Sequence, residues 1–186
     1  LTDPEGARIV ASTGVNNIPL LVVDDIRAVL GRVSAAIYGN PSYDVPVIGI
    51  TGTSGKTTTS YLIESAFRTA GHSVGMIGTT GSRINGVRVP SSLTTPEASD
   101  LQRLFATMRD DGVHRIVMEV SSHSLLLGRV GGTRFRIGAF LNLSQDHLDF
   151  HHTMEEYFQA KARLFTKDSG TCLLYTSPSP RDVEES

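Results

Sequence analysis

The residues best suited to chemistry form the string TGTSGKTT at positions 51–58. This string follows an apolar stretch and precedes an amphipathic one, which is the context of a phosphate-binding loop between a strand and a helix. Its glycines let the backbone approach phosphates closely, and the N–H groups at the start of the helix supply positive potential. Lys56 can reach the β- and γ-phosphates of a nucleotide, and the Thr57 hydroxyl can bind Mg²⁺. The string therefore predicts a nucleotide-phosphate site.

This loop departs from the strict P-loop pattern G-x-x-x-x-G-K-[ST] at its first position. The pattern requires glycine at position 50, where the chain has Ile50, and the next glycine is Gly52. The loop is therefore a variant. The alternative interpretation is a glycine-rich turn that binds no phosphate, but the flanking sequence favours a phosphate loop.

Acidic and histidine residues follow two further apolar stretches. Glu119 lies near the end of the stretch 116–120, and the carboxyl ends of strands in a doubly wound sheet face the ligand crevice. Glu119 can therefore hold Mg²⁺ beside the phosphate loop, or it can simply cap a loop, and the sequence leaves both interpretations open. The string NLSQDHLDFHH follows at positions 142–152. Oxygen ligands with one imidazole suit Mg²⁺ near phosphates better than zinc, and Cys172 is the only cysteine.

Strands alternate with helices along the chain. Apolar runs predict strands at residues 7–10, 20–23, 45–51, 74–78, 116–120 and 137–143. Helical periodicity and capping residues predict helices at 26–38, 55–70 and 154–165, the last opened by a capping box at 153–156. A further helix is expected to begin with Thr95 as its N-cap and Pro96 at its first position. The alternation predicts an α/β fold with a doubly wound, mostly parallel sheet.

Composition excludes several classes of function. Hydrophobic residues make up 39% of the 186 residues and charged residues 19%, which is enough to bury a core. The net charge of -2 gives no nucleic-acid footprint and no membrane-binding surface. A single cysteine excludes an internal disulfide framework and fits a cytoplasmic protein. The first residue, Leu1, is not Met and no signal-peptide pattern follows it, so we expect the true start to lie upstream.

Several motifs together resemble one enzyme family. They lie at residues 49–58, 93–97, 119–123, 128–130, 142–144, 146–151 and 160–165. In this order they resemble the UDP-N-acetylmuramoyl-tripeptide synthetases, the MurE type of Mur ligases, from about Gly6 to Phe165. The resemblance implies that residues 1–40 are the end of a UDP-binding N-terminal domain and residues 41–168 part of a central ATPase domain. Residues 169–186 match nothing in the family, so we expect an unstructured or non-native tail there.

The resemblance also implies an activity. Ligases of this family use ATP and Mg²⁺ to add the third amino acid, diaminopimelate or lysine, to UDP-MurNAc-L-Ala-D-Glu in peptidoglycan biosynthesis. The dipeptide carboxylate is phosphorylated to an acyl phosphate, which the amine of the free amino acid then attacks. We therefore expect the UDP-MurNAc-dipeptide and a free amino acid as partners, no nucleic acid, no membrane, and a monomer. This piece alone is expected to be inactive, because the amino-acid-binding domain is absent from it.

Individual roles follow from the resemblance residue by residue. It implies ATP binding by Gly52, Thr53, Ser54, Gly55, Lys56, Thr57 and Thr58. It implies Mg²⁺ binding by Thr57, Glu119 and His147, and contacts to the UDP-MurNAc-dipeptide by Thr94, Thr95, Ser121 and Arg129. It implies that Lys161 is carbamylated and is catalytic together with Lys56 and His147. The chain departs from the family pattern at Leu127, Leu141 and Gln145, where Gln, Thr and Arg are common.

Two other functions remain open. Folylpolyglutamate synthetases share the ligation chemistry and this type of P-loop, although the motifs at 94–96 and 121–123 favour a Mur ligase. The chain can also be a nucleotide-binding module without turnover. A switch GTPase is disfavoured because no guanine-reading N-K-x-D motif is present.

Overall fold

The computed structural model describes residues 1–15, 17–89, 93–166 and 172–175. A seven-stranded sheet with the order β4-β3-β2-β5-β1-β6-β7 forms its centre. The strands are β1 (Val47–Thr51), β2 (Val74–Gly78), β3 (Gly81–Ile84), β4 (Val87–Val89), β5 (Arg115–Glu119), β6 (Phe135–Phe140) and β7 (Cys172–Tyr175). All neighbours pair in parallel except β2–β3 and β3–β4. The predicted α/β fold with a mostly parallel sheet is confirmed.

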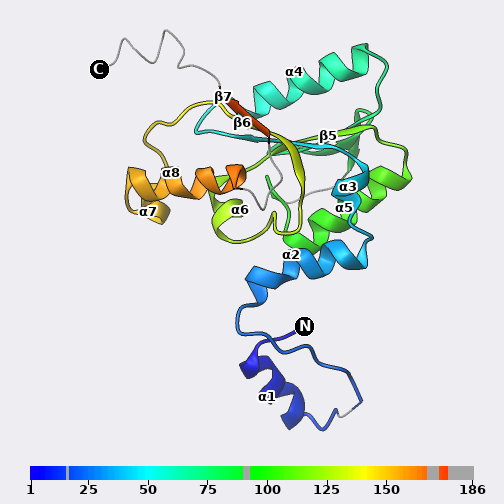
Figure 1. Ribbon diagram of the computed structural model, residues 1–186, viewed down its shortest axis with the longest axis vertical. Coiled ribbons are helices and arrows are strands. Elements are labelled where there is room, and N and C mark those ends of the chain that lie inside the picture. The colour runs from blue at the N-terminus through cyan, green and yellow to red at the C-terminus, as the bar shows by residue number, and fades with distance from the viewer. Residues whose placement is uncertain (16, 90–92, 167–171, 176–186) are drawn as a thin grey trace.

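The described chain contains eight α-helices, and those that follow residue 44 cover both faces of the sheet (Figure 1). They are α1 (Pro4–Ser12), α2 (Ile26–Ile37), α3 (Pro41–Asp44), α4 (Lys56–Thr69), α5 (Ala98–Asp110), α6 (Ser122–Leu126), α7 (Leu148–His151) and α8 (Met154–Ala162), followed by the 3-10 turn η1 (Arg163–Phe165). Figure 1 shows α4 on one face and α5, α6 and α8 on the other. None of the helices in the described part of the chain is both long and apolar enough to cross a membrane.

The core consists of two apolar clusters, one on each face of the sheet. Val47 belongs to the cluster that includes Phe105 of α5 and Leu164 of η1. Ile48 and Ile50 belong to the other cluster, against which Ile63 and Phe67 of α4 pack. Successive residues of β1 therefore point to opposite faces, as the period of a strand requires. Both faces of β1 are buried, which fixes the position of the loop that follows it.

The first 24 residues differ from their prediction. Residues 7–10, expected as a strand, lie in helix α1, because Asp3 caps its N-terminus by accepting a hydrogen bond from Gly6 N and Pro4 occupies its first position. Residues 20–23 form only an isolated bridge between Thr2 and Val22. Helix α1 has no buried residue. The N-cap Asp3 and Pro4 at the first helical position therefore determine the local structure, because no residue of this helix is buried against the rest of the protein.

Three further differences concern elements around the sheet. Helix α5 begins with Glu97 as its N-cap, two residues later than predicted, because Thr95 is buried and its hydroxyl donates to Glu119 O instead. The antiparallel strands β3 and β4 were not predicted, although Asn85 and Gly86 between them have positive φ, as a tight hairpin turn requires. Residues 172–175 form β7 beside β6, so the expected lack of regular structure does not hold for them. The remainder of the predicted tail lies outside the described residues.

Candidate functional site

The predicted phosphate loop joins β1 to α4 at the carboxyl end of the sheet. Gly52 has φ +149° and Gly55, the N-cap of α4, has φ +83°. A Cβ at Gly52 would lie 3.0 Å from the Cβ of Leu141, so glycine also permits a close approach to the chain after β6. The strand, loop and helix therefore have the arrangement that the sequence predicts, with backbone N–H groups of the first turn free for an anion.

Asn142 holds this loop from the neighbouring strand end. Its Oδ1 accepts hydrogen bonds from the backbone N–H groups of Thr53 and Ser54, at 3.1 and 3.0 Å, and its Nδ2 donates to Ser54 O at 3.2 Å. The Thr53 hydroxyl also accepts from Ser144 N at 3.0 Å. The sequence placed Asn142 in a family motif but gave it no role. Asn142 directly follows a strand that neighbours β1, and this position could have indicated its role in holding the loop.

Two lysines share one carbonyl oxygen of the loop. Lys56 Nζ donates to Gly52 O at 2.8 Å and to Thr53 O at 2.9 Å, and Lys161 Nζ donates to the same Gly52 O at 2.9 Å. Lys161 is only 1% exposed and lies 4.3 Å from the centroid of the Tyr157 ring. Lys161 therefore meets the phosphate loop at Gly52, which lies 109 positions earlier in the chain.

Burial changes the proton affinity of both amines. It lowers the pKa of Lys161 to about 7, helped by the positive charge of Lys56, while Asp146 acts weakly in the opposite direction. Burial also lowers the pKa of Lys56, against the opposing attraction of Glu119 and Asp146. A substantial fraction of Lys161 is therefore a neutral amine near neutral pH.

Glu119 is fully buried at the end of β5 and lies beside the loop. It accepts hydrogen bonds from the Thr57 hydroxyl and from both the backbone N–H and the hydroxyl of Thr79, each at 3.0 Å. The sequence thus placed Thr57 and Glu119 correctly at one edge, but it missed Thr79. A hydroxyl and a carboxylate are the hard oxygen donors that Mg²⁺ prefers, and Mg²⁺ keeps several waters and phosphate oxygens. The two residues fit such an ion.

His147 lies apart from that pair. Its ring is 48% exposed, with Nε2 3.6 Å from Asp146 Oδ2, and contacts the rings of His123 and Tyr157. Within the described ranges the structure brings no three His, Cys, Asp or Glu side chains together as a metal site. Among the described residues, His147 makes no hydrogen bond or ion pair with Glu119.

Three histidines gather between α6 and α8. His123 stacks on Phe150 and contacts the rings of His147 and His151. His151 is buried, and its Nε2 lies 2.8 Å from the Ser122 hydroxyl. Burial, followed by the charge of a neighbouring histidine, lowers the pKa of both His123 and His151. The neutral forms of His123 and His151 are therefore favoured, and these two rings pack between α6 and α8.

The four residues expected to contact the dipeptide substrate surround the end of β5. The Thr94 and Thr79 hydroxyls lie 3.3 Å apart, and the buried Thr95 hydroxyl donates to Glu119 O at 3.1 Å. Ser121 caps α6 and accepts from Ser124 N. Arg129 Nε lies 2.8 Å from Glu97 Oε1, an ion pair in which the N–H is not aligned as in a hydrogen bond. Glu97 was not predicted as a site residue.

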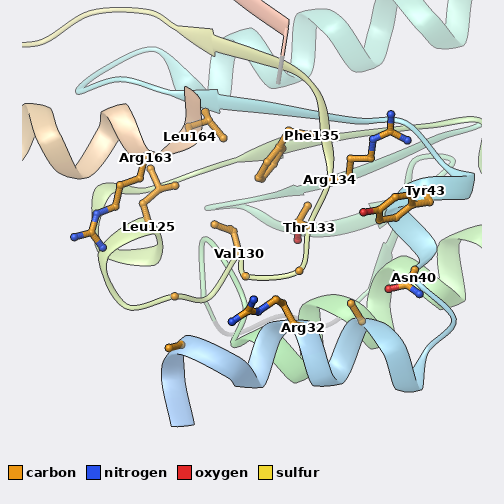
Figure 2. Close-up of a pocket in the computed structure, with 15 residues that line it drawn as sticks. Arg32, Asn40, Tyr43, Leu125, Val130, Thr133, Arg134, Phe135, Arg163 and Leu164 are labelled. Atoms are coloured by element: carbon orange, nitrogen blue, oxygen red, sulfur yellow. The ribbon is translucent and has the colours of Figure 1, made fainter. Parts of the chain in front are cut away.

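A hollow in the described structure lies away from these residues. It has a volume of about 700 Å³ and is lined by residues of α2, by Gly128, by the chain from Val130 to Phe135, and by η1. It contains none of the predicted site residues. Figure 2 shows Arg32 directed toward Val130, whereas Arg134 and Arg163 point away from each other. Because its polar groups do not converge, its size does not make it the reaction site.

Comparison with known proteins agrees with the geometry. Residues 50–178 match the family model described as the Mur ligase middle domain. A UDP-N-acetylmuramoyl-L-alanyl-D-glutamate--2,6-diaminopimelate ligase of Corynebacterium glutamicum is 62% identical over 169 residues, which are 91% of this chain and 32% of that protein. The ligase of the same name from Streptomyces coelicolor is 57% identical over 166 residues, or 89% of this chain and 32% of that one. The chain thus spans about a third of the length of these relatives.

Solved structures give the same picture. A structure of a UDP-N-acetylmuramoyl-L-alanyl-D-glutamate--2,6-diaminopimelate ligase superposes with a TM-score of 0.65 and 34% identity, covering 78% of this chain and 30% of that one. Escherichia coli FolC, in complex with DHPP and ADP, superposes with a TM-score of 0.58 at 21% identity, covering 85% and 43%. The second likeness concerns the fold alone.

Proposed function

This chain belongs to the Mur ligase family, and we propose that it is the nucleotide-binding part of an ATP-dependent ligase that joins diaminopimelate to UDP-MurNAc-L-Ala-D-Glu. The relatives with this chemistry in their names support diaminopimelate over lysine. The observation that carries the proposal is the meeting of Lys56 and Lys161 on Gly52 O, next to the Thr57–Glu119 pair. One buried edge then offers the Lys56 ammonium group for phosphate and hard oxygens for Mg²⁺.

In the proposed reaction the dipeptide carboxylate is activated by phosphorylation. Lys56 Nζ turns from the loop carbonyls to the phosphate oxygens of ATP, while the N–H groups at the start of α4 orient them. Mg²⁺, held by Thr57 and Glu119, would neutralise charge that develops on the transferred phosphoryl group. The acyl phosphate that results has a good leaving group, which the free carboxylate lacks, and the amine of diaminopimelate displaces it. Positioning and charge neutralisation supply most of the acceleration.

We propose that Lys161 acts as a carbamate. Its neutral amine forms a C–N bond with CO₂ and releases a proton, which turns a buried cation into an anion. The pKa of about 7 supports this, because the amine must be neutral to attack. The change also replaces the repulsion between Lys161 and Lys56 by attraction. An anion there can help to hold Mg²⁺, and His147 can join it if its ring turns away from Asp146.

The proposed substrate contacts are Thr94, Thr95, Ser121 and Arg129. Within the described ranges the hydroxyls of Thr95 and Ser121 each make one hydrogen bond, and a hydroxyl can still accept another. Arg129 presents its two Nη groups to a carboxylate or phosphate, for which a planar guanidinium is suited. These residues lie within reach of the end of β5, so the substrate would approach the phosphate loop from the Thr94 side.

A hybrid ligase tests the proposal. Residues 1–165 of this chain replace the matching segment of the Corynebacterium glutamicum relative, and ADP release is measured. We expect release to require both the UDP-MurNAc-dipeptide and diaminopimelate, and to be abolished by Lys56→Ala. Release with a folate and glutamate instead would support a folylpolyglutamate synthetase, and a folded hybrid that binds ATP without turnover would support a nucleotide-binding module.

A further inference from the structure

Glu97 joins two arginines from different parts of the chain. Its Oε1 lies 2.8 Å from Nε of Arg129, in the loop after α6, and its Oε2 lies 3.7 Å from Nη1 of Arg27 on α2. Arg27 also donates to Leu127 O at 3.4 Å, next to the same loop. One carboxylate at the start of α5 therefore links α2 to the loop that carries Arg129.

The Glu97 side chain is not needed to begin helix α5. Glu97 is the N-cap residue, but its side chain makes no capping hydrogen bond. Its backbone carbonyl accepts the first helical bond, from Leu101 N at 2.8 Å, and any residue can supply that carbonyl. In the part of the chain that the structure describes, the carboxylate contacts only the two arginines. Its removal leaves the backbone bonds of α5 in place.

The backbone under Arg129 is held independently of Glu97. A Cβ at Gly31 of α2 would lie 2.2 Å from Gly131 O, and a Cβ at Gly132 would lie 2.5 Å from Gly31 O. Glycine at these positions lets α2 and the loop touch backbone to backbone. The loop therefore has a fixed path, and what remains to be set is the direction of the Arg129 side chain.

Only one edge of the Arg129 guanidinium is occupied. Its side chain is 18% exposed, and within the described residues its Nη groups have no hydrogen-bond partner or ion pair. Glu97 faces Nε, so the edge with the two Nη groups stays free for a bidentate anion. Glu97 also weakens the attraction of Arg129 for that anion. The orienting effect outweighs this because Glu97 is 39% exposed, hence partly screened, and is balanced by Arg27.

We propose that Glu97 is a positioning residue that orients Arg129 toward a carboxylate or phosphate of the UDP-MurNAc-dipeptide, with Arg27 restraining Glu97. This inference rests on the proposed function, in which Arg129 contacts that substrate. A guanidinium held in its binding direction loses less conformational freedom when the anion arrives. Affinity for the dipeptide substrate should therefore depend on Glu97, whereas affinity for ATP should not.

The test is calorimetric titration of the hybrid ligase with UDP-MurNAc-L-Ala-D-Glu and, separately, with Mg²⁺ and a non-hydrolysable ATP analogue. We expect Glu97→Gln to weaken binding of the dipeptide substrate about tenfold and to leave the ATP analogue unaffected. Arg27→Gln should weaken binding of the dipeptide substrate about threefold. The matched control is Asp100→Asn, which removes the same charge from the first turn of α5. Among the described residues Asp100 pairs only with Arg103. This control substitution should change neither affinity.

The outcomes separate this inference from the function on which it rests. A hybrid ligase without substitutions that is folded but binds neither ligand overturns the proposed function and the inference with it. A wild type that binds both, with Glu97→Gln unchanged, overturns the inference alone. The inference is also overturned if Glu97→Gln and Asp100→Asn weaken binding of the dipeptide substrate equally. The same holds if Glu97→Gln weakens binding of the ATP analogue as much as binding of the dipeptide substrate. In either case the effect would come from the charge or packing of α5.

Discussion

The nucleotide half and the substrate half of the candidate site are built by different means. In the nucleotide half, Lys161 and Glu119 are buried and bond to the phosphate loop and to its first helical turn. In the substrate half, Arg129 is directed by Glu97, which is partly exposed, and the loop is seated by glycine contacts. Buried polar networks are costly to disturb, whereas exposed ion pairs contribute little each. Substitutions in the first half should therefore act on chemistry, and those in the second on substrate affinity.

The largest effect is expected from Lys161→Met in the hybrid ligase. Methionine fills the same buried space but cannot form a carbamate, so ADP release should fall at least about a hundredfold, as when a charge-stabilising group is lost from an active site. The wild-type rate should also rise when bicarbonate is added to CO₂-depleted buffer, and the variant should not respond. A variant with the wild-type rate would remove Lys161 from the proposed mechanism.

The next largest effect is expected from disrupting the backbone contact between α2 and the loop that carries Arg129 in the substrate half. In Gly31→Ala the new methyl group meets Gly131 O, a backbone atom that cannot move aside, so the free energy of unfolding should fall by about 2–3 kcal/mol. Urea unfolding of the chain measures it. The control is Gly71→Ala, whose methyl group meets nothing within 4 Å and which should cost only about 1 kcal/mol for its positive φ. If Gly31→Ala left the free energy of unfolding unchanged, α2 would not fix the position of the loop.

The same comparison shows where sequence reasoning succeeds. Strands β1, β2, β5 and β6 and helices α2, α4 and α8 were predicted within a few residues, because periodicity and caps are local. The capping box before α8 is an example, since the Thr153 hydroxyl accepts from Glu156 N. The phosphate loop and the nearby Glu119 were likewise visible, since the ends of parallel strands share one edge of a sheet.

The parts that were missed depend on contacts between distant residues. Thr95 could not be excluded as the N-cap of α5 without knowing that its hydroxyl reaches Glu119 O, 24 residues away. The roles of Asn142 and Glu97 likewise arise from partners that no local pattern names. Conversely, the resemblance implied Lys161, but the reason that its amine is neutral, burial against the phosphate loop beside Lys56, is seen only in the structure.

A smaller effect concerns the pH dependence of stability in CO₂-free buffer. The folded-state pKa of Lys161 is about 7 and its ordinary value is 10.5, so between these pH values the unfolded chain binds more protons than the folded one. The free energy of unfolding should therefore rise with pH in this window, by at most about 1.4 kcal/mol per pH unit from this group. Below pH 7 the cost of burying the ammonium is fully present. Urea unfolding from pH 7 to 9 should show a shallower rise in Lys161→Met, and equal slopes would contradict the lowered pKa.

The smallest effect separates two contributions of Tyr157 to the nucleotide half. Its hydroxyl donates to the Thr53 hydroxyl at 3.3 Å, and its buried ring lies against Lys161 Nζ. Tyr157→Phe keeps the ring, and a hydrogen bond this long contributes less than about 1 kcal/mol, so affinity for the ATP analogue should fall no more than about threefold. Tyr157→Leu removes the ring as well and should lower the free energy of unfolding by about 2 kcal/mol or more. If Tyr157→Phe instead abolished ADP release in the hybrid ligase, the hydroxyl would have to act on a reacting group, and the nucleotide half would contain a catalytic residue that its packing does not reveal.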